Sequence, residues 1–317
     1  MIAFPGRKLI SYYMPRTQKE FLFRLYNIST REMKSKVVYP KNLSLSLTTY
    51  CNLRCKFCYR DEFNASYIDP ENLKKIITPI KHSEQIDLTG WGEAILYKNY
   101  AKCVEYILSV NSKKEIIAQT SNGSLANRYA SILKGRIKRF VISLNSASKK
   151  TYEQEMVGGK FEKTVANINN FMENITESDR KNVKLHFVTY TKNFREMPDF
   201  VRLASELNIP TVSFGQMMSN KPDEDKYTLL NVKEEYNNLL KQVEKNGRKY
   251  KVEVFYRRFG ENLGLNNKYC SAPFDDLYIR TDGEISPCCY FGDVSFGNVF
   301  KNDFDSIWFD PDGLLAK

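Results

Sequence analysis

Three cysteines within a run of eight residues constrain this chain more than any other feature. They are Cys51, Cys55 and Cys58, at the spacing Cys-x3-Cys-x2-Cys. Residues 43–48 just before them read Leu-Ser-Leu-Ser-Leu-Thr, and this period of two predicts a strand that ends where the cysteines begin. Most 4Fe–4S clusters take four cysteines, so three thiolates on one short loop can hold three irons and leave the fourth iron open to a ligand from outside the protein.

A zinc site is the alternative for these cysteines. Structural zinc sites have four protein ligands and commonly begin with a Cys-x2-Cys or Cys-x4-Cys pair. The next cysteine is Cys103, which lies in an amphipathic helical pattern and is interpreted as a small core residue. The local count of cysteines therefore favours a reactive cluster.

The composition indicates a cytoplasmic globular protein. The chain has 317 residues, of which 42% are hydrophobic, and this suits one large domain or one domain with a small appendage. No stretch approaches the roughly 18 consecutive apolar residues of a membrane span, and residues 1–10 lack the apolar region of a signal peptide. Seven cysteines without a secretory signal predict thiols that bind metals rather than form disulfides.

The net charge of +11 fits a solvated basic surface or an anionic partner. Phosphorylated small molecules, RNA and acidic electron-donor proteins are all compatible with it. The Lys and Arg residues are spread along the chain without forming a block, so nucleic acid is not favoured over the other partners.

The octet 51–58, with aromatic Phe57 before its third cysteine, resembles the cluster loop of the radical S-adenosylmethionine (radical SAM) enzymes. The resemblance implies that Cys51, Cys55 and Cys58 hold a 4Fe–4S cluster whose open iron binds the amino and carboxylate groups of SAM, and that Phe57 lies near the adenine. In this family, electron transfer into the cluster splits SAM to methionine and a 5′-deoxyadenosyl radical, which abstracts hydrogen from the substrate. An electron donor of the flavodoxin or ferredoxin type is the implied partner.

Strands and helices alternate from the cysteine loop onward. Periodicity predicts six strands, separated by helices, at residues 43–48, 85–89, 115–120, 139–144, 183–189 and 211–215. This is the pattern of parallel βα units, and six strands are fewer than the eight of a closed barrel. We therefore expect an α/β fold, a partial (β/α)6 TIM-type barrel like that of the resembled family. His186 lies in the middle of the fifth strand, where it can face the barrel interior, and a hydrogen-bonded core histidine is the favoured interpretation.

The loops at the carboxyl ends of the strands are the expected place for chemistry in such a barrel. Gly-Trp-Gly-Glu at 90–93 resembles the Gly-Gly-Glu segment that contacts the SAM amino group in the family, although Ala94 replaces its usual proline. Small residues such as Gly90 and Gly92 let backbone carbonyls approach an ammonium group, and Glu93 can add a charge-assisted hydrogen bond.

Polar residues follow two further strands. Ser143 and Asn145 match the position of the ribose-contacting residues of the family. Ser121 and Asn122 are placed to reach the SAM carboxylate or ribose. Ordinary turn chemistry explains these four residue types equally well.

Cys270, Cys288 and Cys289 form a second group near the end of the chain. Their spacing around Gly283 resembles the start of the SPASM or twitch extension, which binds an auxiliary 4Fe–4S cluster in many radical SAM enzymes. Asp282-Gly283 is a favoured hairpin turn that would bring Cys270 and Cys288 together, so a small iron–sulfur domain with a β-hairpin is expected. The later cysteines of a complete module are missing, which leaves one cluster with an unknown fourth ligand or an open iron, or a zinc site.

The adjacent pair Cys288 and Cys289 leaves two interpretations open. Neighbouring side chains in extended chain point to opposite sides, so both sulfurs reach one cluster only if the backbone turns. Otherwise Cys288 is a ligand and Cys289 is a thiol that faces the substrate and donates a hydrogen atom, as in radical SAM epimerases.

Changes of composition divide the chain into four segments. These are an N-terminal extension (1–40) with a helix expected near 18–33, the radical SAM barrel (41–218), a linker with a helix (219–268) and the SPASM or twitch-like domain (269–317).

The expected function is hydrogen abstraction by a radical SAM enzyme from an anionic small molecule of the sugar or nucleotide type, giving oxidation or epimerisation. Modification of a ribosomal peptide is the alternative substrate class. A non-catalytic iron–sulfur or zinc protein is the alternative from a different functional class.

Overall fold

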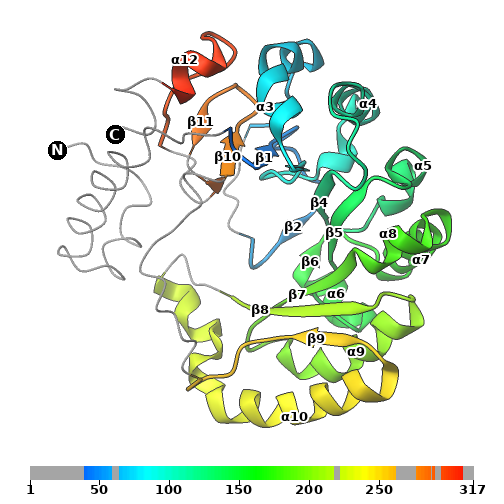
Figure 1. The fold of residues 1–317 in the computed structure, drawn as a ribbon. Coiled ribbons are helices and arrows are strands. Elements are labelled where there is room, and N and C mark those ends of the chain that lie inside the picture. The colour runs from blue at the N-terminus through cyan, green and yellow to red at the C-terminus, as the bar shows by residue number, and fades with distance from the viewer. Residues whose placement is uncertain are drawn as a thin grey trace.

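One curved sheet organises the structure. A computed structural model describes residues 39–58, 64–217, 222–261, 276–286, 288–289 and 294–309. The helix expected near 18–33 lies outside these residues, as does Cys270. The described strands form a nine-stranded sheet in the order β11-β10-β1-β3-β4-β5-β7-β8-β9. Helices α3, α4, α5, α7, α8, α9 and α10 follow its outer side (Figure 1).

Six parallel strands make up the barrel. They are β1 (Asn42–Leu45), β3 (Gln85–Asp87), β4 (Ile117–Ser121), β5 (Ile137–Ser143), β7 (Val183–Thr189) and β8 (Thr211–Gln216). Each strand pairs in parallel with the next one in this order. The six strands lie where periodicity predicts them, and the α/β class and the partial (β/α)6 barrel are confirmed.

The helices occupy the predicted intervals. Those of the barrel are α3 (Ile77–His82), α4 (Tyr100–Val110), α5 (Ala130–Leu133), α6 (Lys149–Glu155), α7 (Phe161–Asn174), α8 (Glu177–Lys181) and α9 (Met197–Glu206). The first helical segment divides into a 3-10 helix, η1 (Pro70–Ile76), and α3. Pro79 accounts for this, because proline is tolerated in the first turn of an α-helix but not in its interior.

The hydrophobic core lies between the sheet and these helices. Along β7, the buried residues Leu185 and Phe187 alternate with half-buried Lys184 and His186. The ring of Phe187 packs edge-on against Phe200 of α9, with the centroids 4.7 Å apart. Because alternate side chains point to opposite faces of a strand, Lys184 and His186 face the concave interior of the barrel, which is therefore partly polar.

Strands from beyond the barrel extend both edges of the sheet. On one side, β9 (Glu253–Phe255) pairs in parallel with β8 and is covered by the long helix α10 (Lys233–Tyr250). On the other side, β10 (Asp276–Ile279) pairs with β1 and forms the predicted hairpin with β11 (Ile285–Ser286). Gly283 in the hairpin turn has φ +86°, a conformation that favours glycine. The hairpin is thus built onto the edge of the barrel sheet, and the four-segment division of the chain stays a prediction.

Candidate active site

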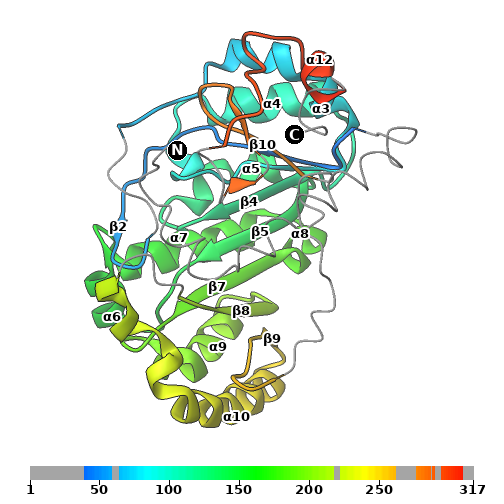
Figure 2. The same cartoon turned by 90° about the vertical axis from the view of Figure 1, so that its left-hand side faces the viewer.

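The cysteine loop follows β1 and is held by the segment after α6. Its two-residue strand β2 (Arg54–Cys55) pairs antiparallel with β6 (Met156–Val157), and β2 and α6 lie on the same side of the molecule (Figure 2). The sulfurs of Cys55 and Met156 are 3.3 Å apart. The Lys56 amide donates to the Glu155 carbonyl at 3.0 Å. The loop therefore has a defined support on one flank.

The three cysteines of this loop differ from Cys103 in exposure. Cys58 is exposed, and Cys51 and Cys55 are half-buried. Cys103 on α4 is fully buried, and burial raises the pKa of its thiol to about 12. The interpretation of Cys103 as a core residue is confirmed, and it cannot serve as a fourth ligand without unfolding α4. Within the described ranges, no three His, Cys, Asp or Glu side chains are grouped as ligands of a single metal ion.

Gly90 and Gly92 pack against the backbone that enters the cysteine loop. A Cβ on Gly90 would lie 2.3 Å from Ser46 Oγ, and one on Gly92 would lie 2.3 Å from the carbonyl oxygen of Tyr50. The Glu93 amide also donates to the Tyr50 carbonyl at 2.7 Å. Glycine is needed at position 92 because two backbone segments are in contact, and at position 90 because the Ser46 side chain lies against it. The sequence alone does not show either reason.

Glu93 is a buried carboxylate between two loops. It caps the short 3-10 helix η2 (Ala94–Leu96), and its side chain accepts hydrogen bonds from the amides of Asn122 at 2.6 Å and Ile95 at 3.4 Å. Burial raises the pKa of Glu93 to about 7, although these amides and the Ser121 hydroxyl act in the opposite direction. Glu93 thus joins the loop after β3 to the loop after β4.

Asn122 carries this connection on to the cysteines. Its side-chain Nδ2 donates to Asn52 Oδ1 at 2.9 Å and lies 3.8 Å from Cys51 Sγ. Ser121 is buried beside it and accepts a hydrogen bond from the Gly123 amide at 3.1 Å. The structure therefore brings Glu93, Asn122 and the first cysteine into one contiguous group.

Asn145 has a structural use that accounts for its residue type. Its backbone has φ +58°, which asparagine tolerates better than most residues. Its side-chain oxygen accepts from the Val188 amide at 2.7 Å, and its nitrogen lies 3.5 Å from the sulfur of Met156, the residue that touches Cys55. Ser143, two residues earlier, is half-buried and pairs in register with His186.

Phe57 is half-buried next to Tyr190, with the ring centroids 5.7 Å apart. The Tyr190 hydroxyl donates a hydrogen bond to buried Glu155, which also lies 3.6 Å from Lys56 Nζ. Phe57 therefore belongs to the same packed flank of the loop as β6.

The C-terminal cysteines are described in part. Cys288 is half-buried and Cys289 is exposed, and the backbone bends at these residues instead of running as a strand. Burial raises the pKa of Tyr278 to about 12, and nearby Cys289 acts in the same direction. Cys289 is therefore close to Tyr278, whose Cα pairs with Ser44 of β1.

Interior-facing residues of the later strands were not among the predicted site residues. His186 is half-buried on the concave side and hydrogen-bonded to Ser213, so of the two interpretations it takes the one in which it faces the barrel interior. The burial of the imidazole and the charge of Lys184 lower the pKa of His186. Arg139 and Asp87 form an ion pair on the same interior surface. In the sequence, apolar and polar residues alternate from Val183 to Phe187, and this pattern indicates that His186 and Lys184 face the same side of the strand.

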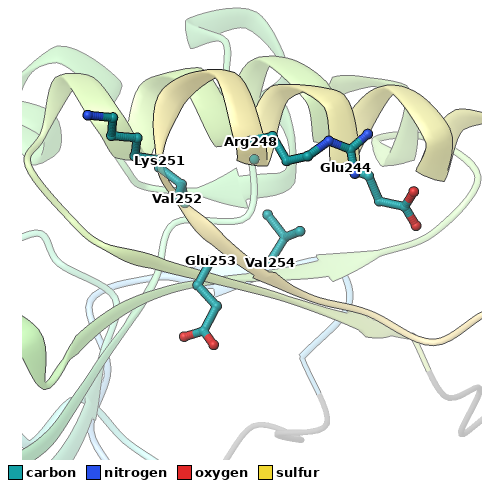
Figure 3. Close-up of a pocket in the computed structure, with 7 residues that line it drawn as sticks. Glu244, Arg248, Lys251, Val252, Glu253 and Val254 are labelled. Carbon is teal, nitrogen blue, oxygen red and sulfur yellow. The ribbon is translucent and has the colours of Figure 1, made fainter.

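A cavity of about 310 Å³ lies elsewhere, between the C-terminal part of α10 and β9. Its lining includes Glu244, Arg248, Lys251 and Val254 (Figure 3). It lies at the start of β9, whereas the cysteine loop follows the end of β1 in the same parallel sheet. The cavity is therefore separate from the candidate active site.

Two family profiles match this chain. The radical SAM superfamily profile matches residues 45–204, and the profile of SPASM, an iron–sulfur cluster-binding domain, matches residues 270–313. A probable GTP 3′,8-cyclase of Methanococcus aeolicus is 24% identical over 271 residues, which cover 78% of this chain and 85% of that protein. A GTP 3′,8-cyclase of Alkaliphilus oremlandii is 25% identical, with coverage of 78% and 80%.

Solved structures share the fold. Streptococcus suis SuiB bound to S-adenosylmethionine superposes with a TM-score of 0.65 at 17% identity, covering 94% of this chain and 72% of SuiB. SuiB bound to its precursor peptide SuiA gives a TM-score of 0.64 at 15% identity, with coverage of 98% and 73%. Since the superfamily profile covers half of the sequence, the chain belongs to the radical SAM superfamily, whose enzymes use a 4Fe–4S cluster and S-adenosylmethionine, and it carries a further iron–sulfur domain of the SPASM type.

Proposed function

We propose that Cys51, Cys55 and Cys58 hold the 4Fe–4S cluster to which SAM binds. The donor set fits such a group, because three soft thiols lie on one supported loop and the remaining cysteine of the barrel is buried in α4. When bound, the cluster supplies the electron that cleaves SAM to methionine and a 5′-deoxyadenosyl radical. The observation that carries the proposal is the contact of Asn122 with Cys51, which joins the ends of three strands into one site.

The residues around this contact are suited to hold SAM. Each oxygen of Glu93 accepts one backbone amide, and an ionised carboxylate has further lone pairs for the SAM ammonium group. A bound cation would also lower the raised pKa of Glu93 and keep it ionised. Gly90 and Gly92 set the position of Glu93 against the loop, and Ser121, Asn122, Ser143 and Asn145 supply polar groups for the carboxylate or ribose. Phe57 is assigned to a position near the adenine ring of SAM.

The substrate in this proposal is an anionic small molecule of the sugar or nucleotide type, and the reaction is oxidation or epimerisation. The net charge of +11 favours an anionic ligand. Relatives named GTP 3′,8-cyclase align over 78% of the chain, which supports a nucleotide. The interior surface of the barrel, with Arg139, Lys184 and His186, offers groups for phosphate and hydroxyl recognition.

Modification of a peptide is the second candidate. The SuiB structure with its precursor peptide covers 98% of this chain in superposition. The likeness is one of fold, and the shared barrel accommodates either class of substrate. A peptide would enter the same concave side.

A second 4Fe–4S cluster is assigned to the C-terminal cysteines Cys270, Cys288 and Cys289. The chain bends at Cys288 instead of running as an extended strand, which supports ligation by both neighbouring thiols. The competing assignment makes Cys289 a hydrogen-atom donor that faces the substrate. Replacement of Cys289 by alanine distinguishes the two assignments. If Cys289 is a cluster ligand, the variant loses iron. If Cys289 is a hydrogen-atom donor, the variant keeps its full iron content but no longer forms product.

The electron donor proposed here is an acidic protein of the flavodoxin or ferredoxin type. Arg54 and Lys56 are exposed on the cysteine loop and give it a basic surface. No helix in the described part of the chain is long and apolar enough to cross a membrane.

The test is anaerobic reconstitution with iron and sulfide, followed by incubation with SAM and dithionite. The wild-type protein is expected to release 5′-deoxyadenosine, and the Cys55→Ala variant is not. GTP is the first substrate to add, with loss of GTP and appearance of a new nucleotide as the readout. A protein that binds zinc instead of a cluster and releases no 5′-deoxyadenosine would contradict the proposal.

A further inference from the structure

A row of four side chains crosses the interior face of the sheet, from the carboxyl end of β5 through the middle of β7 and β8 to the end of β9. The pairing register aligns Ser143 of β5 with His186 of β7, His186 with Ser213 of β8, and Ser213 with Phe255 of β9. Residues in register on neighbouring parallel strands point to the same face. The row therefore runs from Ser143, which is assigned to the SAM site, to His186, Ser213 and Phe255.

Phe255 turns toward the concave side. A Cβ on Gly247 of α10 would lie 3.3 Å from the methyl groups of Val254, so Val254 faces the helix and its neighbours on β9 face away from it. Figure 3 shows Val254 directed toward α10 and Glu253 directed away from it. Phe255 shares the face of Glu253, and 49% of its surface is exposed. An aromatic ring of this exposure inside a barrel is a surface on which a planar ligand can stack.

Lys184 places a cation next to this ring. Its Nζ lies 5.5 Å from the centroid of Phe255. The same charge contributes to the low pKa of His186, so it is also close to the imidazole. A flat apolar surface beside an ammonium group matches a ligand that combines a planar ring with an anionic group.

His186 offers one free direction for a hydrogen bond. Its Nδ1 pairs with Ser213 Oγ at 2.9 Å, and the hydroxyl can donate or accept, so either tautomer is compatible. Its Nε2 points toward Gly215, where a Cβ would lie 3.2 Å from that nitrogen. Gly215 has an ordinary negative φ, so its backbone does not demand glycine. The missing side chain leaves room for a ligand group next to Nε2.

We infer that Lys184, His186 and Phe255 form the substrate-binding wall of the barrel and select a nucleotide. Phe255 stacks on the base, Lys184 binds phosphate, and His186 Nε2 hydrogen-bonds a polar group of the base or sugar. This inference rests on the proposed function and names the residues and the substrate class for its substrate site. It places the substrate beside Ser143 on the concave face of the sheet, toward the edge formed by β9 and away from β1 and the cysteine loop.

The test uses the anaerobically reconstituted holoenzyme with SAM and measures binding of three probes by equilibrium dialysis. The probes are GTP, guanosine and ribose 5-phosphate. Phe255→Ala is expected to weaken the binding of GTP and guanosine by about 5- to 150-fold, the range for loss of a stacked base. The binding of ribose 5-phosphate should stay unchanged. Lys184→Met is expected to weaken the binding of GTP and ribose 5-phosphate by about tenfold or more, as for loss of a charged hydrogen bond. The binding of guanosine should stay unchanged. Gly215→Ala is expected to weaken the binding of GTP and guanosine, because the new methyl group obstructs His186 Nε2.

Leu230→Ala and Lys138→Met are the matched controls, since both side chains are exposed away from this wall. Release of 5′-deoxyadenosine without substrate reports whether each variant keeps its fold and SAM site, and it is expected to match wild type. GTP binding by the Phe255 and Lys184 variants at wild-type strength would overturn the inference and leave the proposed function standing. Wild-type protein that cleaves SAM but binds none of the probes would overturn both the inference and the nucleotide assignment.

Discussion

The side-chain nitrogen of Asn122 lies 3.8 Å from the sulfur of Cys51, although 71 positions separate the two residues in the chain. The same side chain donates to Asn52, and its own backbone amide donates to Glu93. Asn122 is thus the point at which the loops after β1, β3 and β4 meet. This arrangement explains how a short cysteine loop acquires a fixed position above an open barrel.

Loss of the Asn122 side chain should loosen the cluster. Asn122→Ala removes the contacts with Asn52 and Cys51, and iron is expected to leave the reconstituted protein several times faster in the presence of a chelator. Asn169→Ala is the control, because Asn169 is half-buried on α7 and its side chain donates to Glu173 of the same helix, away from the cysteine loop. Equal rates of iron release in the two variants would show that the contact has no part in holding the loop.

Stability of the cluster-free protein should depend on the ionisation of Glu93. Its pKa is raised from 4.5 to about 7, so the folded state prefers the protonated form. The stabilisation is complete below about pH 4.5 and is lost as the pH rises through about 7, a change of at most about 3 kcal/mol in the free energy of unfolding. The measurement is urea unfolding across this pH range.

Glu93→Gln provides the comparison for this pH effect. The amide cannot ionise, and its NH₂ group would face a backbone donor, so we expect a loss of about 1–3 kcal/mol in stability. The difference between wild type and variant should then vary with pH between about 4.5 and 7. A difference that stays constant over this range would mean that Glu93 does not titrate there.

Gly92→Ala should disturb the cysteine loop directly. The new Cβ would lie 2.3 Å from the Tyr50 carbonyl oxygen, so the backbone must move, at a cost of about 1–3 kcal/mol. Iron content after reconstitution is expected to fall with it. Gly135→Ala meets no atom within 4 Å but has φ +74°, so it carries only backbone strain and should keep full iron content. Loss of iron in both variants alike would contradict a local effect at Gly92.

The cysteines of the cluster-free protein should differ in their rates of alkylation. Exposed Cys58 is expected to react with iodoacetamide within minutes at pH 8, whereas buried Cys103, with a pKa of about 12, reacts only after unfolding. Mass spectrometry of the tryptic peptides measures both rates. Modification of native Cys103 at the rate of Cys58 would contradict its place in the core.

The strands and helices of the barrel could be predicted because their periodicity is strong. Burial alternates throughout the interval 183–189, and β7 has the predicted ends. The cysteine loop could be predicted because its spacing is compact and specific. These features are encoded by residues close together in the sequence.

Contacts between distant segments could not be predicted in this way. The pairing of β10 with β1 and of β9 with β8 depends on the sheet as a whole. The register that aligns His186 with Phe255 follows from these pairings, so the sequence alone does not show which side chains lie beside His186. The close packing of Gly92 on Tyr50 has the same origin, because nothing near Gly92 in the sequence indicates which backbone it meets.

The most direct test of the central claim is the yield of 5′-deoxyadenosine from SAM and dithionite under anaerobic conditions, measured for wild type and for the Cys51, Cys55 and Cys58 alanine variants. We predict a brown wild-type protein that releases 5′-deoxyadenosine and three variants that release none. A colourless wild-type protein that carries zinc on these cysteines and leaves SAM intact would contradict the account.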